Sequence, residues 1–265
     1  MTKIAFFDID GTLINVPHQL LKPTEKTIET LSKFQNEGHY IVVASARGEM
    51  PESLKEIPFD GFIGCDGGYI VFHDEVLLDN IFTVEQLNLQ NSIYEACHGQ
   101  YIMSEHHNSF FSDKNGDLIK KHLRLYRGSD EIGEDYNDDW RFQTVKANTV
   151  TALFHSARDL HEAIDMLPDN WAINAYDTGH IRMDVHPPGF SKGQACQYLY
   201  QKLGIKKEDT YAFGDGENDI EMLELVGTGV VMDNAGEVVK QHGDVVTLSV
   251  DEDGITYAFQ NLLNL

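Results

Sequence analysis

Residues 4–12 read IAFFDIDGT, an apolar run that ends in two carboxylates, Asp8 and Asp10, and a Gly-Thr pair. Such a run is typical of a strand buried on both faces of a parallel sheet. The two acids would then lie at the carboxyl end of the strand, the edge where open α/β sheets bind their ligands. Because carboxylates this close repel each other, they need a cation or a shared proton. The stretch predicts an α/β fold with a Mg²⁺ site and one carboxylate free to attack; the alternative is a plain turn, in which Asp and Gly are common.

Composition limits the class of protein. The chain has 265 residues, enough for one large domain or two modest ones with a substantial core. It carries 20 Lys and Arg against 43 Asp and Glu, a formal net charge of -23. A chain this acidic repels phosphate backbones and anionic membranes, so we expect no nucleic-acid partner and no membrane partner. Most of the acids are expected to be solvated side chains.

The cysteines and the amino-terminal stretch indicate a soluble, cytoplasmic protein. Cys65, Cys97 and Cys196 are odd in number and widely spaced, with no Cys-x-x-Cys pair, which argues against a disulfide framework or a zinc ribbon. They are expected to be small core residues. The apolar run before Asp8 is too short for a signal peptide, and no stretch approaches the ~20 apolar residues that span a bilayer. A monomer or a weak homo-oligomer fits these features.

Strand and helix patterns alternate at both ends of the chain, which predicts a Rossmann-like parallel sheet with helices on both faces. Strands are expected at 3–7, 40–44, 61–65, 69–72, 76–78, 210–213, 229–232 and 245–248. Helices are expected at 24–37, after Pro51, and at 192–203, 218–226 and 235–241. We therefore predict an α/β core domain made of residues 1–80 and 184–265.

The middle of the chain has a different pattern. Helices are expected at 84–97 and 157–167, and short strands at 100–104, 109–112, 149–155, 172–175 and 181–185. Residues 128–139 are rich in Asp, Glu and Gly, which favours an exposed loop. We predict an α+β domain over residues 81–183, inserted between the two halves of the core.

Three further stretches could carry chemistry. Residues 42–48, VVASARG, place the Ser45 hydroxyl at the end of a buried strand, where it could bind a phosphate or merely leave the strand. Lys192 stands at a helix start, where it could neutralise an anion or be a solvated surface lysine. Residues 213–219, FGDGEND, deliver Asp215 and Asp219 as either Mg²⁺ ligands or an acidic helix cap. Since all these stretches fall at strand ends or helix starts, they are expected to meet at one sheet edge, where Asp8 and Asp215 would share a cation.

The four stretches resemble, in order, the four motifs of the haloacid dehalogenase superfamily. The resemblance covers essentially the whole chain and is specifically to Cof-like phosphatases with a C2-type cap of the C2B kind, since the insertion falls between the second and third motifs. Residues 65–68 (CDGG), 232–235 (MDNA) and 253–255 (DGI) add further matches. The resemblance implies a Mg²⁺-dependent phosphatase of small phosphorylated metabolites, sugar phosphates in the first place, that works through an aspartyl-phosphate intermediate.

The resemblance also implies catalytic roles for particular residues. Asp8 would be the nucleophile and a Mg²⁺ ligand. Asp10 would be the general acid and base, and would give the metal its backbone carbonyl. Asp215 would ligate Mg²⁺ directly, while Asp219 would support the waters of the metal. Lys192 would bridge the phosphate and Asp8.

A second group is implied to hold the transferring phosphate. Ser45 would bind it with its hydroxyl, assisted by backbone N–H groups near Ile9 and Ala46. Lys192 would neutralise its charge, and Asn218 would contact it from the fourth motif.

The chain departs from the family's pattern at three places. The second motif usually reads Thr-Gly-Arg; here Ser45 keeps the hydroxyl, and Ala46 matters only if its position needs a positive φ. Asp66 replaces a usual Asn, and Asp233 replaces a usual Gly. Both would add negative charge near an anionic substrate if they face it, and could so alter substrate preference.

Two other functions stay open. A phosphomutase would pass the phosphoryl group to a sugar instead of water. A non-catalytic phospho-ligand-binding protein would use the same acidic pocket, as receiver domains do, although such domains need no cap. Retention of both Asp8 and Asp10 argues against the binding-only role.

Specificity is expected to come from cap residues that face the site. The candidates are His106, His107, Asn108, Arg124, Arg127, Tyr176, His180 and Arg182. The adjacent His106 and His107 would point to opposite faces of a strand, so they could not easily chelate a metal together.

Overall fold

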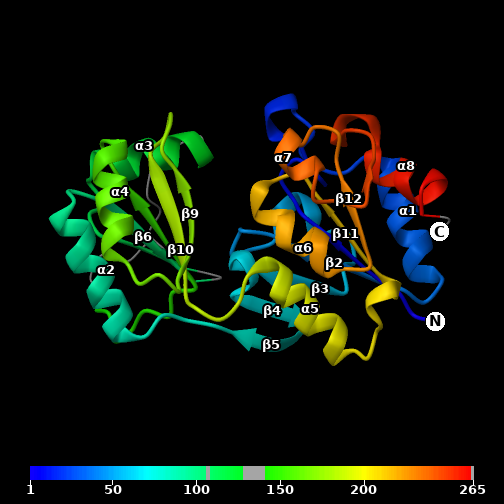
Figure 1. Cartoon of the computed structure of the whole chain (residues 1–265), viewed down its shortest axis with the longest axis horizontal. Helices are drawn as coiled ribbons and strands as arrows, with labels where there is room; N and C mark the ends of the chain where they lie inside the picture. Colours follow the sequence, from blue (N-terminus) through cyan, green and yellow to red (C-terminus); the bar gives the residue numbers. More distant parts are fainter. Residues whose placement is uncertain (106–107, 128–140, 264–265) are drawn as a thin grey trace. The chain divides into compact units, whose positions relative to one another are not determined.

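The structure, a computed structural model, describes residues 1–105, 108–127 and 141–263, and its backbone forms two compact units (Figure 1). The core unit comprises Met1–Leu78 and Phe190–Leu265, and the second unit comprises Asp79–Gly189. The second unit is thus inserted between two parts of the core in the sequence. It begins two residues before the predicted limit of 81 and ends six residues after the predicted limit of 183.

The core unit is built on an eight-stranded sheet in the order β13-β12-β11-β1-β2-β3-β4-β5. The pairs from β13 through to β3 are parallel, and β4 turns back antiparallel to β3. Its strands are β1 (Ile4–Phe7), β2 (Tyr40–Ala44), β3 (Gly61–Gly64), β4 (Tyr69–Phe72), β5 (Glu75–Asp79), β11 (Thr210–Gly214), β12 (Thr228–Val231) and β13 (Val245–Val246). The α/β fold class expected from the sequence is confirmed.

Strand β1 shows why the sheet is covered on both faces. Its side chains alternate, so Ile4 and Phe6 enter one apolar cluster while Ala5 and Phe7 enter another. The first cluster is closed by α5 and α6, and the second by α1 and α8 (Figure 1). The helices of this unit are α1 (Glu25–Asn36), α5 (Lys192–Lys202), α6 (Ile220–Leu225), α7 (Glu237–Lys240) and α8 (Gly254–Asn261). Its 3₁₀ turns are η1 (Val16–His18), η2 (Glu52–Leu54), η3 (Cys65–Gly67), η4 (Lys207–Asp209), η5 (Glu217–Asp219) and η6 (Val250–Glu252).

The second unit has a five-stranded sheet in the order β7-β6-β8-β10-β9, with antiparallel neighbours throughout. Helices α2 and α4 pack on one face of it, and α3 packs over part of the other. The strands are β6 (Gln100–Ser104), β7 (Ser109–Phe111), β8 (Thr149–Leu153), β9 (Ala172–Tyr176) and β10 (Arg182–His186). The helices are α2 (Val84–Ala96), α3 (Asp117–Arg127) and α4 (Ala157–Met166).

Several sequence predictions need correction in detail. The helix expected at 218–226 begins as η5 and becomes α6 only at Ile220, and the segment after Pro51 is a single 3₁₀ turn. The strand expected at 245–248 is reduced to β13, and the helix expected at 235–241 to α7. Helices α3 and α8 were not predicted. The loop prediction for 128–139 and the pair His106 and His107 lie outside the described residues.

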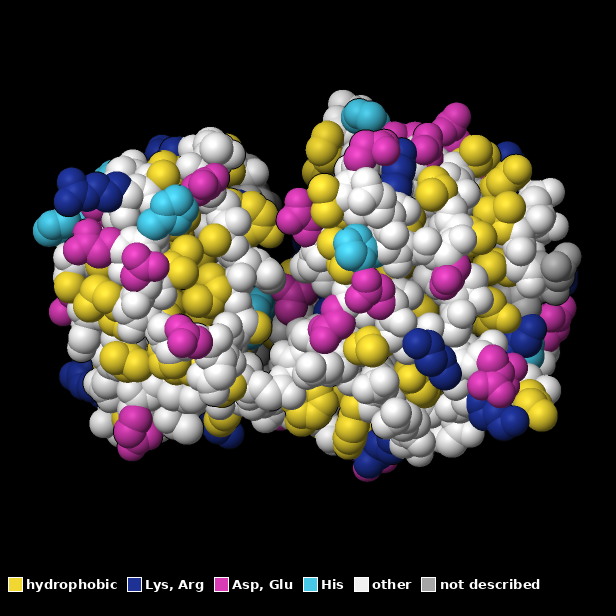
Figure 2. All heavy atoms as spheres, viewed as in Figure 1, with side chains coloured by type: hydrophobic (Ala, Val, Ile, Leu, Met, Phe, Trp, Pro, Cys, Tyr) yellow, Lys and Arg dark blue, Asp and Glu magenta, His cyan; other side chains and the backbone are white. Residues whose placement is uncertain are grey.

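Acidic side chains do not gather in one patch on the surface that Figure 2 shows. On the face that Figure 2 shows, Asp and Glu side chains are scattered over both units, as expected of solvated acids. Across the described ranges, none of the helices combines the length and the apolar character that a bilayer crossing requires.

Candidate active site

The candidate site is built where neighbouring parallel strands of the core sheet end. Asp8 follows β1, and its N–H continues the ladder by donating to the Phe213 carbonyl on β11 at 3.0 Å. Ser45 follows β2, with its N–H donating to the Ile63 carbonyl at 2.8 Å, and Asp215 follows β11. The parallel register therefore brings these side chains to one edge, as the sequence predicts.

Lys192 is the centre of the charged groups. It is the first residue of α5, whose start is capped by Ser191, and it is only 2% exposed. Its Nζ lies 2.8 Å from Asp8 Oδ1 and 2.6 Å from Asp219 Oδ1. Burial lowers the pKa of Lys192, but the carboxylates of Asp219, Asp8 and Asp66 more than offset this and raise it well above its usual value. The lysine is therefore held as a buried cation among acids.

The acids outnumber that cation. Burial raises the pKa of Asp8 well above its usual range, and the charge of Asp219 raises it further, against the opposing effect of Lys192. Burial, followed by the charge of Asp219, raises the pKa of Asp215 to about 6. Both shifts report surplus negative charge in a poorly solvated place, which an added cation would relieve.

The carboxylates are close enough to share such a cation. One oxygen from each of Asp8, Asp215 and Asp219 lies within 4.8 Å of the others, a buried acidic cluster suited to a hard metal ion. The Asp219 carboxylate has other partners, because Oδ1 accepts from Lys192 and Oδ2 accepts from the N–H groups of Asp215 and Gly216 at 3.0 and 2.9 Å. Asp219 therefore fixes the loop after β11, while the three carboxylates together give the cluster its surplus negative charge.

The Gly-Thr pair of the first stretch shapes the position of Asp215. Gly11 has φ +93°, and a Cβ there would lie 2.0 Å from Asp215 Oδ2, so the loop leaves no room for a side chain. The Thr12 hydroxyl donates to Asp215 Oδ1 at 3.0 Å. Two segments about 200 residues apart are thus fitted to each other around one carboxylate.

Asp10 has a different environment from Asp8. Both of its carboxylate oxygens accept from Arg47, at 2.7 Å from Nε and 2.7 Å from Nη2. This two-point contact ties the loop after β1 to the loop after β2, and the Asp10 side chain remains about half exposed. Asp10 is therefore accessible, and it is separate from the group bound to Lys192.

The predicted phosphate-binding residues lie at the same edge but are partly engaged. Ser45 is buried, and its hydroxyl accepts from the Arg47 N–H at 3.2 Å. Asn218, in η5, donates from Nδ2 to Asp66 Oδ1 at 3.1 Å. Ile9 is buried in the core, and Ala46 does not have a positive φ, so its replacement of Gly brings no backbone strain.

The two acidic departures from the family pattern end up in contrasting places. Asp66 is buried beside Lys192, whereas Asp233 is largely exposed and pairs with Lys240 at 2.8 Å. The neighbouring Asn234 was not predicted as a site residue: its Nδ2 donates to the Gly11 carbonyl at 2.9 Å and lies 3.3 Å from Asp215 Oδ2. The stretch MDNA was the available signal, since it follows a parallel strand of the same sheet.

Some of the cap candidates form a group on the second unit. The Arg182 guanidinium lies 3.7 Å from the ring centre of Tyr176, its cross-strand neighbour, and 3.6 Å from Asp184. The Nε2 atom of His180 lies 3.1 Å from the Nδ1 atom of His122 on α3. Arg124 is exposed on α3. Asn108 is also exposed, and its Nδ2 donates to Glu105 Oε2 at 3.3 Å; the Arg127 side chain lies outside the described residues.

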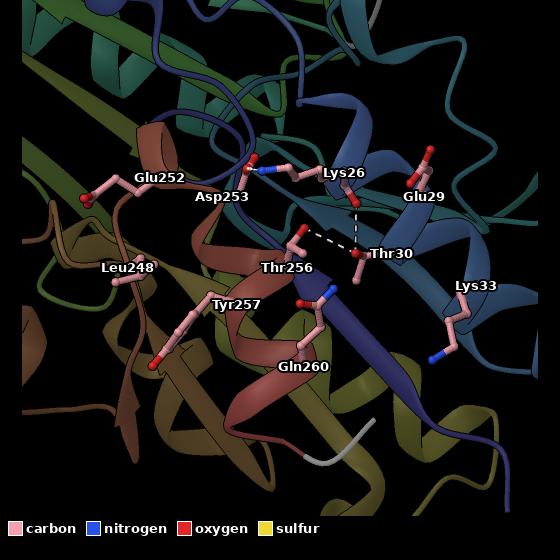
Figure 3. Close-up of a pocket in the computed structure, with 10 residues that line it drawn as sticks. All are labelled: Lys26, Glu29, Thr30, Lys33, Leu248, Glu252, Asp253, Thr256, Tyr257 and Gln260. Atoms are coloured by element: carbon pink, nitrogen blue, oxygen red, sulfur yellow. Dashed lines mark hydrogen bonds and ion pairs between the residues drawn. The ribbon is translucent and has the colours of Figure 1, made fainter.

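A separate hollow of about 510 Å³ lies between α1 and α8 of the core unit (Figure 3). Lys26 and Asp253 form an ion pair at 3.1 Å in its wall, and Thr30 bonds to Thr256. Its lining residues include none of the predicted site residues. The DGI match begins at Asp253, which precedes α8 and also accepts a hydrogen bond from Thr24, the residue before α1. This motif therefore connects the starts of α1 and α8 and contributes no side chain to the candidate site.

The chain is similar to known proteins over nearly its whole length. The model of the haloacid dehalogenase-like hydrolase family matches residues 5–259. The Bacillus subtilis (strain 168) protein YkrA is 32% identical over 98% of each chain. The HMP-PP phosphatase of Cronobacter sakazakii is 29% identical over 89% of this chain and 85% of its own. The solved structure of BT4131, a sugar phosphatase of haloacid dehalogenase subclass IIB, matches with a TM-score of 0.81 and 28% identity over 98% of both chains. The expected enzyme class, a phosphatase-type hydrolase, is confirmed, and the chain belongs to the haloacid dehalogenase-like hydrolases.

Proposed function

We propose that this chain is a Mg²⁺-dependent phosphatase that hydrolyses small phosphorylated metabolites through an aspartyl-phosphate on Asp8. The observation that carries the proposal is the buried Lys192, whose Nζ lies 2.8 Å from Asp8. A lysine at this place holds the attacking carboxylate in one orientation and offsets charge as a phosphoryl group approaches.

The chain's own residues can supply both steps. An Asp8 oxygen attacks phosphorus, the bond from phosphorus to the ester oxygen breaks, and Asp10 gives the departing oxygen a proton. Asp10 then takes a proton from a water that attacks the phosphorus of the aspartyl-phosphate, which releases phosphate and restores Asp8. Because Arg47 holds both Asp10 oxygens, Asp10 must give up part of that contact to act.

The acidic cluster fits a Mg²⁺ ion. Asp8 and Asp215 would hold it with their carboxylates, Asp10 with its backbone carbonyl, and Asp219 would orient the surrounding waters. The raised pKa values of Asp8 and Asp215 support a site in which a divalent cation balances the surplus negative charge. When bound, the ion would add positive charge that attracts the phosphate and stabilises its transfer.

The remaining phosphate contacts would come from Ser45, Lys192, Asn218 and the backbone N–H groups near Ile9 and Ala46. We propose that residues 81–183 act as a cap that shields the substrate from bulk water during the first step. Sugar phosphates are the first class to try, because a sugar phosphatase is among the structural relatives. Three free, buried cysteines support a cytoplasmic enzyme, and a monomer or a weak homo-oligomer stays the prediction for its assembly.

The test is phosphate release from a panel of substrates with Mg²⁺ and with EDTA. The panel contains sugar phosphates, nucleotides, pyridoxal phosphate and a chromogenic phosphate ester. Release that requires Mg²⁺ and favours one class supports the proposal and identifies that class. Interconversion of phosphosugar isomers without free phosphate would replace it with a phosphomutase. Binding of phosphorylated ligands without either reaction would leave a binding protein.

A further inference from the structure

Asp66 lies in a turn whose backbone directs it into the site. Cys65, Asp66 and Gly67 have φ of 53°, 47° and 100°, so three successive residues adopt left-handed conformations in η3. A Cβ at Gly67 would lie 2.3 Å from the Ser191 carbonyl oxygen, which shows how closely this turn is seated against the start of α5. The turn leaves Asp66 only 6% exposed, next to the helix that begins with Lys192.

The Asp66 carboxylate is engaged with two residues of the proposed machinery. Oδ1 accepts from Asn218 Nδ2 at 3.1 Å, and it lies 4.0 Å from Lys192 Nζ. The charge of Asp66 is one of the three that raise the pKa of Lys192. Asp66 is therefore a third buried carboxylate within 4.0 Å of a single lysine, beside Asp8 and Asp219.

This placement has two separable consequences. The hydrogen bond orients the Asn218 amide, and an uncharged oxygen in the same place could still accept it. The negative charge, by contrast, offsets part of the positive charge of Lys192 and opposes any anion that approaches it. An Asn in place of Asp66 would keep the acceptor and remove the charge.

We propose that Asp66 is a positioning residue that orients Asn218 and whose charge weakens phosphate binding at this site, so that the product is released and substrates with additional anionic groups are disfavoured. The inference rests on the proposed function. It assigns a role to one of the two acids that depart from the family pattern, and none to Asp233, which pairs with Lys240 at the surface.

The test compares Asp66→Asn with Asp66→Ala, and uses Asp233→Asn as the matched control. Asn tolerates the left-handed backbone and keeps an acceptor for Asn218, so Asp66→Asn should fold normally. Calorimetric titration with inorganic phosphate, in the presence and absence of Mg²⁺, should show tighter binding to Asp66→Asn by about threefold or more. Asp233→Asn should bind phosphate as the unmodified protein does.

Turnover separates charge from orientation. Asp66→Asn should lower KM and the inhibition constant of phosphate. It should also raise kcat/KM for a bisphosphate relative to kcat/KM for a monophosphate. Asp66→Ala should lower kcat because Asn218 loses its partner, and the conservative Asn variant should restore kcat. Unchanged or weaker phosphate binding by Asp66→Asn, with the unmodified protein active, would overturn the inference. Absence of turnover in every protein would instead overturn the proposed function, and the calorimetric comparison would still decide the effect of the charge on phosphate binding.

Discussion

The strand edge of the core unit and the sheet of the second unit arrange polar side chains in opposite ways. At the core edge, acids from loops far apart in sequence gather around one buried lysine, because parallel strands end side by side. On the antiparallel sheet, polar residues such as Tyr176 and Arg182 meet as cross-strand pairs on adjacent strands. The first arrangement depends on where strands end, and the second depends on register. We infer that the reaction takes place at the core edge and that residues of the second unit decide which substrate is preferred.

The largest expected effect is from Asp8→Asn. Turnover should fall by at least about a thousandfold, because an amide cannot attack phosphorus as a carboxylate does. The free energy of unfolding without metal should stay the same or rise, since burial and the charge of Asp219 penalise the ionised acid. Steady-state kinetics and thermal melts measure the two quantities. Retained turnover in a metal-replete assay would exclude Asp8 as the nucleophile.

Lys192→Met should also lose activity, but with the opposite effect on stability. Removing this cation leaves Asp8 and Asp219 as buried charges without their partner, which typically costs about 3–5 kcal/mol. Lys202→Met, at the exposed end of the same helix, is the control and should be nearly neutral. A stable Lys192→Met protein would show that the lysine does not hold the acids together.

The effect of pH on metal binding should be intermediate in size. The pKa of Asp215 is about 6 in the folded protein against an ordinary value of 3.8, so the folded apoprotein holds more protons across that interval. Its stability should therefore increase as pH falls from about 6 to about 4, by about 1–2 kcal/mol for this group. Added Mg²⁺ needs the ionised form, so its stabilising effect should shrink over the same interval.

Melting temperatures with and without Mg²⁺ at several pH values measure this linkage. Asp215→Asn should remove most of both effects. A stabilisation by Mg²⁺ that is independent of pH would contradict the placement of the ion beside Asp215.

The smallest expected effect is from Arg182→Ala in the second unit. Arg182 shares a sheet face with Leu153, away from the face that α2 and α4 cover. The ratio of kcat/KM between two metabolites should change by about tenfold, as expected of a residue that contributes to the choice of substrate. Arg158→Ala, on the exposed side of α4, is the control. Parallel loss for every substrate would assign Arg182 a structural role.

The difference between the two regions also explains what the sequence could predict. The runs that end in Asp8, Ser45 and Asp215 predict strand ends, and parallel strands bring those ends to one edge without further information. The contacts of Asp10 with Arg47 and of Asp66 with Asn218 were not predictable, because both depend on side-chain geometry between loops.

Two helices, α3 and α8, were not predicted, for different reasons. Helix α8 begins at Gly254 after Asp253, a left-handed residue whose carboxylate is bound by Thr24 and Lys26, and this start has no conventional capping side chain. Its start therefore depends on tertiary contacts more than on propensity. Helix α3 is polar overall, but Leu118, Ile119 and Leu123 recur on one helical face and pack against β6, so an amphipathic signal was available in the sequence.

The central claim is that Asp8 carries the phosphoryl group. The most direct measurement is mass spectrometry of the protein after rapid acid quenching during turnover of the preferred substrate, followed by mapping of the modified peptide. The account predicts the addition of one phosphoryl group at Asp8, absent in Asp8→Asn. With the chromogenic ester, whose leaving group departs without a proton from Asp10, the addition should increase in Asp10→Asn, because only the activation of water is then impaired. Turnover with no phosphorylated protein in Asp10→Asn, or a phosphoryl group on another residue, would contradict it.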